Sequence, residues 1–199
     1  MSSFAAWLER TYPAGIDILC NNAGQAFKGS TWGADEATIT IGTNVVGTMR
    51  VTNALLPSLK RKSGRIINVC SQAGKQRIIR SDALRRRFAE ASSEDSVRAL
   101  MDEFIAAIRD NTYASKGWPQ SMYGISKLGE ATWTRILAQQ QRDVTVSACC
   151  PGWCSTDMSS HMGPRSAAQG ADVAVWLALA PKEDVPTGRF WSDRQEEGF

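Results

Sequence analysis

A tyrosine and a lysine four residues apart, Tyr123 and Lys127, form the pair in this sequence with the most recognisable chemistry. They fall at the start of a predicted helix over residues 123–141, so both side chains lie on one face about a turn apart. A nearby ammonium favours the phenolate and lowers the pKa of a tyrosine from about 10 toward neutral pH. The pair could therefore supply a general acid. The same spacing also occurs on many solvated helices, so alone it is a weak signal.

Short polar segments directly follow three predicted strands. Apolar runs at 16–20, 65–70 and 144–149 are typical of buried strands, and a further short strand is predicted at 188–191. The polar segments after the first three are Asn21-Asn22-Ala23-Gly24, Ser71-Gln72-Ala73-Gly74 and Cys150-Pro151-Gly152-Trp153. The carboxyl ends of parallel strands meet at one edge of a sheet, so we expect these segments to share one ligand-binding region.

Helices are predicted between these strands. Apolar residues recur at helical spacing around Phe4, Trp7 and Leu8, through 41–59, and along the face Val97, Leu100, Met101, Phe104, Ile105 and Ile108. Another helix is predicted at 167–180, capped by Ser166 and ended by Pro181. Alternation of helices with short apolar strands indicates an α/β fold, with a parallel sheet covered by helices on both faces.

Composition narrows the function classes. The chain has 199 residues, 43% hydrophobic and 22% charged, which is ordinary for one globular domain. Its net charge of +3 is too small to indicate a nucleic-acid or membrane partner. No apolar run reaches the ~20 residues of a membrane span and the start does not resemble a secretory signal, so we expect a cytoplasmic protein. The five cysteines should be free thiols, and Cys150, Cys154 and His161 lack the spacing of a zinc site, so no metal is predicted.

The motifs, taken in order, resemble those of one known family. They are Asn21-Asn22-Ala23-Gly24, Thr43-Asn44-Val45-Val46-Gly47-Thr48, Asn68-Val69-Cys70-Ser71, Gly117-Trp118-Pro119-Gln120-Ser121-Met122-Tyr123-Gly124-Ile125-Ser126-Lys127 and Cys149-Cys150-Pro151-Gly152-Trp153-Cys154-Ser155-Thr156-Asp157-Met158. The sequence resembles the short-chain dehydrogenase/reductases, and among them the monomeric NADPH-dependent carbonyl reductases. The resemblance covers almost the whole chain. It implies a Rossmann-like, doubly wound parallel sheet in a single domain over 1–199, with a helical insertion at about 75–118 that favours a monomer.

The resemblance also implies a role for individual residues. Tyr123 would donate a proton to a substrate carbonyl held by Ser71, Lys127 would bind the nicotinamide ribose and lower the tyrosine pKa, and Asn44 would position a water. The expected cofactor is NADPH. Its expected contacts, besides Tyr123 and Lys127, are Asn22, Ala23, Gly24, Pro151, Gly152, Cys154, Ser155 and Thr156. Trp118 and Trp153 would border the substrate pocket with Ser71 and suit an aromatic or quinone carbonyl. Taken singly, each also has a structural reading: Asn44 as a helix bridge, Ser71 as a turn residue, and both tryptophans as core.

The sequence departs from the family pattern in one respect, because it contains no glycine-rich phosphate loop of the form TGxxxGxG. By comparison with the family the chain begins just before the fourth strand, so the first three strands are expected to be absent. Two functions remain open: part of a carbonyl reductase that reduces aldehydes, ketones or quinones, or a non-catalytic remnant serving as an interaction module. The complete catalytic set favours the first. The 199-residue chain alone is expected to have little activity, because nothing in it replaces the phosphate loop.

Overall fold

Five strands form a single sheet in the computed structural model, which describes residues 2–60 and 63–199. The strands are β1 (Ile18–Asn21), β2 (Arg65–Val69), β3 (Thr145–Cys150), β4 (Arg189–Ser192) and β5 (Gln195–Glu197). They lie in the order β1-β2-β3-β4-β5; the first four are parallel and β5 is antiparallel to β4. Within the described residues β1 pairs only with β2, so it forms one edge of the sheet.

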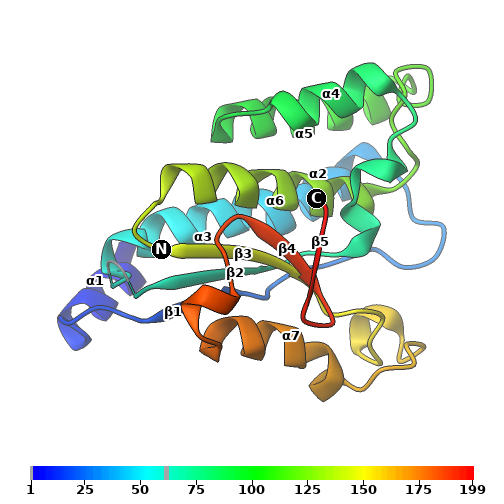
Figure 1. The fold of residues 1–199 in the computed structure, drawn as a ribbon. Helices are drawn as coiled ribbons and strands as arrows, with labels where there is room; N and C mark the ends of the chain where they lie inside the picture. The colour runs from blue at the N-terminus through cyan, green and yellow to red at the C-terminus, as the bar shows by residue number, and fades with distance from the viewer. Residues whose placement is uncertain (1, 61–62) are drawn as a thin grey trace.

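Helices cover both faces of this sheet (Figure 1). They are α1 (Ser2–Thr11), α2 (Ala34–Ile41), α3 (Thr48–Leu55), α4 (Asp82–Glu90), α5 (Glu94–Arg109), α6 (Met122–Gln140) and α7 (Ala167–Leu179). In Figure 1, α2, α3 and α6 lie above the sheet, α7 lies below it, and α4 and α5 form a further layer above α6. The predicted α/β architecture, with a parallel sheet between helical layers, is confirmed.

The predicted helix over residues 41–59 is interrupted. A π-helical segment, Gly42–Gly47, joins α2 to α3, and a 3-10 turn, Leu56–Ser58, follows. A π segment inserts an extra residue into the hydrogen-bonding repeat, and such bulges occur often at functional sites. Asn44 lies in this segment, so the bulge sets the direction of one of the predicted site residues.

The last strand, β5, was not expected from the sequence, which indicated a polar tail after residue 191. The turn between β4 and β5 consists of Asp193 and Arg194, both with positive φ (51° and 61°). Hairpin turns of type I′ need positive φ at both residues and usually contain Asn-Gly or Asp-Gly, so the usual sequence signal is absent here. Glu197 of β5 pairs with Lys75 and accepts a hydrogen bond from Gln72 at 3.1 Å. The hairpin therefore fastens the segment that follows β2.

The amphipathic face predicted around residues 97–108 is buried on its own chain. Ser93 caps α5, in a capping box with Ser96. Ile105 is half-buried. The other five residues of the face are buried: Val97, Leu100, Met101, Phe104 and Ile108. They pack in one core cluster with α2 and α6. Residues 75–118 thus contain α4 and α5 over α6, whereas their status as an insertion and the monomeric state stay predictions.

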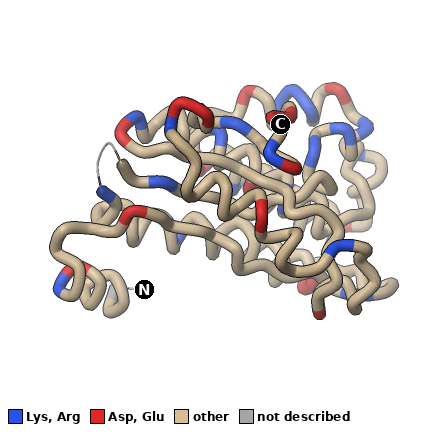
Figure 2. Tube along the Cα trace, turned by 60° about the horizontal axis from the view of Figure 1, so that its bottom comes forward, with Lys and Arg blue, Asp and Glu red and all other residues tan. Residues whose placement is uncertain are grey.

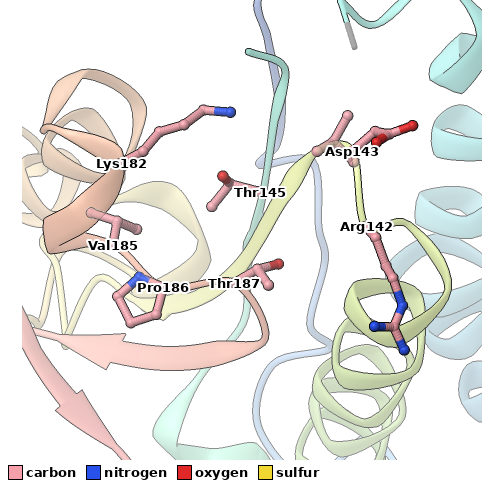
Figure 3. Close-up of a pocket in the computed structure, with 8 residues that line it drawn as sticks. Arg142, Asp143, Thr145, Lys182, Val185, Pro186 and Thr187 are labelled. Atoms are coloured by element: carbon pink, nitrogen blue, oxygen red, sulfur yellow. The ribbon is translucent and has the colours of Figure 1, made fainter. Parts of the chain in front are cut away.

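The surface of the described residues carries mixed charge (Figure 2) and a hollow away from the carboxyl ends of the strands. In the view of Figure 2, basic and acidic residues are interspersed over the described chain. Figure 3 shows a hollow lined by Arg142, Thr145, Lys182 and Pro186 among others. Thr145 begins β3, so this hollow lies at the opposite end of the sheet from the predicted site. Among the described helices, none is both long and apolar enough to cross a membrane.

Candidate active site

The predicted site residues come together where β1, β2 and β3 end. Residues 22–24 follow β1, Ser71 follows β2, and residues 151–156 follow β3. Helix α6 brings its first two turns against the end of β2, because Lys127 Nζ donates a hydrogen bond to the Val69 carbonyl at 2.8 Å. Ser121 begins the helix by accepting a hydrogen bond from Gly124 N at 3.1 Å. This cap sets where α6 starts, and so where Tyr123 points.

Ser71 and Tyr123 are in contact through their side chains. Ser71 is the cap of the 3-10 turn Gln72–Gly74, and its Oγ accepts a hydrogen bond from Ala73 N at 3.1 Å. Ser71 also lies near enough to Tyr123, which is half-buried, for its side chain to act by hydrogen bonding on the pKa of the phenol. Two hydroxyl groups at one point can both be directed at the oxygen atom of a bound molecule.

The pKa of Tyr123 is raised, contrary to the sequence-based expectation that Lys127 would lower it toward neutral pH. Burial of the phenol is the largest cause. The Lys127 ammonium, with Nζ 6.0 Å from the ring centroid, and the Ser71 hydrogen bond both act to lower the pKa but do not outweigh burial. A raised pKa keeps the phenol protonated at neutral pH. It also makes the phenol a weaker acid than a free tyrosine.

Lys127 is buried, with 3% of its surface exposed, and is paired with a carboxylate. Its Nζ donates to Glu130 Oε2 at 2.7 Å as well as to the Val69 carbonyl. Burial acts to lower the pKa of Lys127, but Glu130, Cys70 and Tyr123 together raise it above its ordinary value. Lys127 is thus a fixed positive charge, and an ammonium with two of its three protons donated retains one for a ligand.

Asn44 is fully buried and links the loop after β1 to α6. Its Oδ1 accepts from Gln25 N at 2.8 Å, and its Nδ2 donates to the Gln25 carbonyl and to Ser126 Oγ, each at 2.9 Å. The backbone carbonyl of Asn44 accepts from Thr48 Oγ1 at 3.0 Å. Because both amide hydrogens are donated within the protein, the side chain acts here by holding the Gln25 loop against α6.

Gly24 lies directly over Asn44 and Lys127. A Cβ added at this position would come within 3.3 Å of Asn44 Oδ1 and 3.5 Å of Lys127 Nζ. The preceding Asn22 and Ala23 are exposed. A glycine backbone leaves a cradle above the ammonium that a side chain would fill, which fits the close approach of a flat, hydroxyl-bearing ligand such as a nucleotide ribose.

The loop after β3 is packed against α7. Gly152 has φ +77°, a conformation that favours glycine. Cys154 Sγ lies so close to Gly170 that a Cβ there would come within 2.2 Å of the sulfur. Cys150, at the end of β3, is near enough to Tyr123 that a thiolate there would raise the phenol's pKa. The residues expected to meet a cofactor in this loop, all half-buried, are Pro151, Gly152, Cys154, Ser155 and Thr156.

The two tryptophans expected at a substrate pocket lie in different surroundings. Trp153 is 60% exposed beside the loop after β3. Trp118 is only 3% exposed and packs against Phe88 and Phe104, with ring centroids 6.0 and 5.2 Å away. In the structure Trp118 is therefore a core residue rather than an open wall, because α4 and α5 enclose it.

Three residues that the sequence analysis did not select also shape the site: Gln25, Ser126 and Glu130. Gln25 and Ser126 are the two partners of the Asn44 amide. Glu130 is the partner of Lys127 and is itself buried. The pairing of Lys127 with Glu130 is indicated by their spacing, because a lysine and a glutamate three residues apart share one face of a helix. The same spacing is common in surface ion pairs, so it does not show that Glu130 is buried.

Gly74 sets how closely the Ser71 segment packs on α6. A Cβ there would fall 2.5 Å from the Lys127 carbonyl carbon and 2.6 Å from Leu128 N, both backbone atoms that cannot rotate away. We expect Gly74→Ala to separate Ser71 from Tyr123 and to destabilise the fold by about 1–3 kcal/mol. Urea unfolding measures the loss. Gly42→Ala is the matched control, since nothing lies within 4 Å of its Cβ and its φ is −56°. Equal stability of the two variants would contradict this packing.

Fold and site together define a class: a parallel α/β protein whose helical Tyr-x-x-x-Lys pair meets a serine at the carboxyl ends of the strands. The model of the family described as short chain dehydrogenase matches residues 1–83. Carbonyl reductase (NADPH) 1 of Mus musculus is 35% identical over 194 residues, which cover 92% of this chain and 70% of that protein. Its counterpart in Homo sapiens is 35% identical over 202 residues, with 96% and 72% covered. The chain belongs to the short-chain dehydrogenase/reductase family and is an oxidoreductase of that type.

Solved structures agree with this fold. Salutaridine reductase from Papaver somniferum superposes with a TM-score of 0.88 at 26% identity, covering 97% of this chain and 77% of that one. The NADPH-bound carbonyl reductase from chicken fatty liver gives a TM-score of 0.63 at 19% identity, with 100% and 72% covered. The Rossmann-like fold class is confirmed.

Proposed function

We propose that the protein reduces carbonyl compounds to alcohols with NADPH as the hydride donor. The cluster of Ser71, Tyr123 and Lys127 at the carboxyl ends of β1 to β3 is the observation that carries the proposal. The similarity to carbonyl reductases (NADPH) supports the cofactor and the substrate class.

Each residue of the set has a task in this reaction. NADPH, when bound, supplies a hydride to the carbonyl carbon, and negative charge then builds on the carbonyl oxygen. Ser71 donates a hydrogen bond to that oxygen and Tyr123 gives it a proton, so both stabilise the transition state more than the ground state. Lys127 contributes a fixed positive charge and a remaining donor for a ribose hydroxyl. Asn44 keeps the loop that carries Gly24 in register with α6.

The cofactor contacts fall on both sides of this cluster. Asn22, Ala23 and Gly24 lie along one side, and the cradle over Lys127 at Gly24 supports that assignment. The loop 151–156 lies on the other side and would meet the nicotinamide amide. Trp153, exposed beside this loop, supports an aromatic or quinone substrate. We further propose a cytoplasmic monomer that acts on small molecules.

One observation favours a second function, a non-catalytic interaction module. The sequence contains no TGxxxGxG loop, and backbone amides of such a loop normally bind the cofactor phosphates. A protein that kept the Tyr-Lys pair but bound no cofactor would use this fold only as a surface for interaction.

The two functions are separated by assays of the protein purified from its source organism. We expect consumption of NADPH in the presence of a quinone or an aromatic ketone, followed by absorbance, and formation of the alcohol. Absence of NADPH binding to the natural protein would favour the interaction module.

A further inference from the structure

Glu130 is a buried carboxylate beside the proposed proton donor. It lies on α6 one turn after Lys127, and 1% of its surface is exposed. Its Oε2 accepts the hydrogen bond from Lys127 Nζ at 2.7 Å, whereas Oε1 is buried with no hydrogen-bond partner. A buried carboxylate with an unpartnered oxygen is costly, so ordinary packing does not explain this residue.

The groups that face Glu130 come from three elements. Lys127 and Tyr123 are on its own helix, Cys70 follows β2, and Cys149 is on β3; each of these four interacts electrostatically with Glu130. Burial raises the pKa of both thiols far above neutral, so they stay uncharged. The charge around Lys127 and Tyr123 at neutral pH therefore depends on Glu130.

We propose that Glu130 is a positioning residue for the proposed proton donor, Tyr123. When Glu130 is ionised, it holds the Lys127 ammonium at the Val69 carbonyl and offsets the positive charge of Lys127 beside Tyr123. When Glu130 is protonated, the positive charge of Lys127 acts on the phenol without this offset. The consequence for catalysis rests on the function proposed above. The coupling between the three side chains does not, because it is a property of the unliganded chain.

The signs of the interactions support this coupling. Lys127 lowers the pKa of Tyr123, and Glu130 raises it. Burial raises the pKa of Glu130 to about 7 against the lowering effect of Lys127, so its charge changes in the neutral range. Above that pH the ionised Glu130 raises the pKa of the phenol and makes it a weaker acid. Below it the phenol becomes more acidic.

The test follows Tyr123 through a range in which it does not itself titrate. The sequence has three tyrosines, so Tyr12→Phe with Tyr113→Phe leaves Tyr123 as the only phenol. We expect the 13C signal of its Cζ atom to show an inflection near pH 7, at the same midpoint as the Glu130 carboxyl carbon. Different midpoints, or a flat Tyr123 signal, would overturn the proposal without any variant of Glu130 being needed.

A variant pair assigns the inflection. Glu130→Gln should abolish it, because the amide does not titrate. Thr134→Val is the matched control: Thr134 lies on α6 one turn further on, and its hydroxyl bonds the Glu130 carbonyl and Asn68 without carrying charge. We expect this variant to keep the inflection. Persistence of the inflection in Glu130→Gln would show that another group causes it.

The same variants connect the coupling to turnover. If the protein reduces carbonyls, the pH profile of kcat/KM should contain a step near pH 7 that Glu130→Gln removes and Thr134→Val retains. An active enzyme whose profile is the same with and without Glu130 would overturn the catalytic part. A protein without turnover would refute the proposed function instead, while the Tyr123 titration would still decide the coupling.

Discussion

Replacing Tyr123 by phenylalanine is expected to lower carbonyl reduction by roughly 10²- to 10⁴-fold. The substitution removes only the hydroxyl that Ser71 contacts and keeps the ring in place on α6. Because the phenol is the proposed proton donor, kcat should fall while KM for NADPH changes little. Steady-state kinetics together with a direct binding measurement of NADPH would separate the two.

The matched control for this substitution is Tyr113→Phe. The Tyr113 ring packs on Trp32, with centroids 5.0 Å apart, and phenylalanine preserves that contact away from the site. We expect this variant to retain full activity. A Tyr123→Phe enzyme with more than about a tenth of the original kcat would mean that another group gives the proton.

The positions of the elements could be predicted from the sequence because their signals are local. Apolar runs marked the parallel strands to within a few residues, and Ser166 was a recognisable helix cap, as the structure has it. The hairpin at Asp193 and Arg194 was missed because its positive φ angles fall on residues that rarely adopt them.

The electrostatics of the site could not be predicted from the sequence in the same way. The spacing of Tyr123 and Lys127 indicated the attraction between them but not the burial that outweighs it and raises the tyrosine pKa. Likewise, nothing local showed that Glu130 lies in the interior or that Trp118 is enclosed by α4 and α5. These properties depend on which elements pack together, and periodicity alone does not specify that.

Lys127→Met is expected to destabilise the protein by about 3–5 kcal/mol at pH 8, in addition to its effect on turnover. The side chains are similar in length, but Glu130 would lose the ammonium that compensates its charge, and neither of its oxygens would be hydrogen-bonded. Because Lys127 lowers the pKa of Glu130, its removal should raise that pKa further above the present value of about 7.

The pH dependence of this loss has a definite sign. An unfolded glutamate ionises near pH 4.3, whereas the folded one holds its proton to a higher pH, so stability is lost as the pH rises between the two values. The free energy of unfolding of the unmodified protein should stop falling once the pH passes about 7, whereas that of Lys127→Met should continue to fall above pH 7. Urea unfolding at pH 5.5 and pH 8 would measure the difference, with about 1.4 kcal/mol for each unit by which the pKa rises.

Lys127→Met combined with Glu130→Gln removes both charges and should recover much of the loss at pH 8. If the single variant is as stable as the double one at both pH values, Glu130 is not the buried charge that Lys127 compensates.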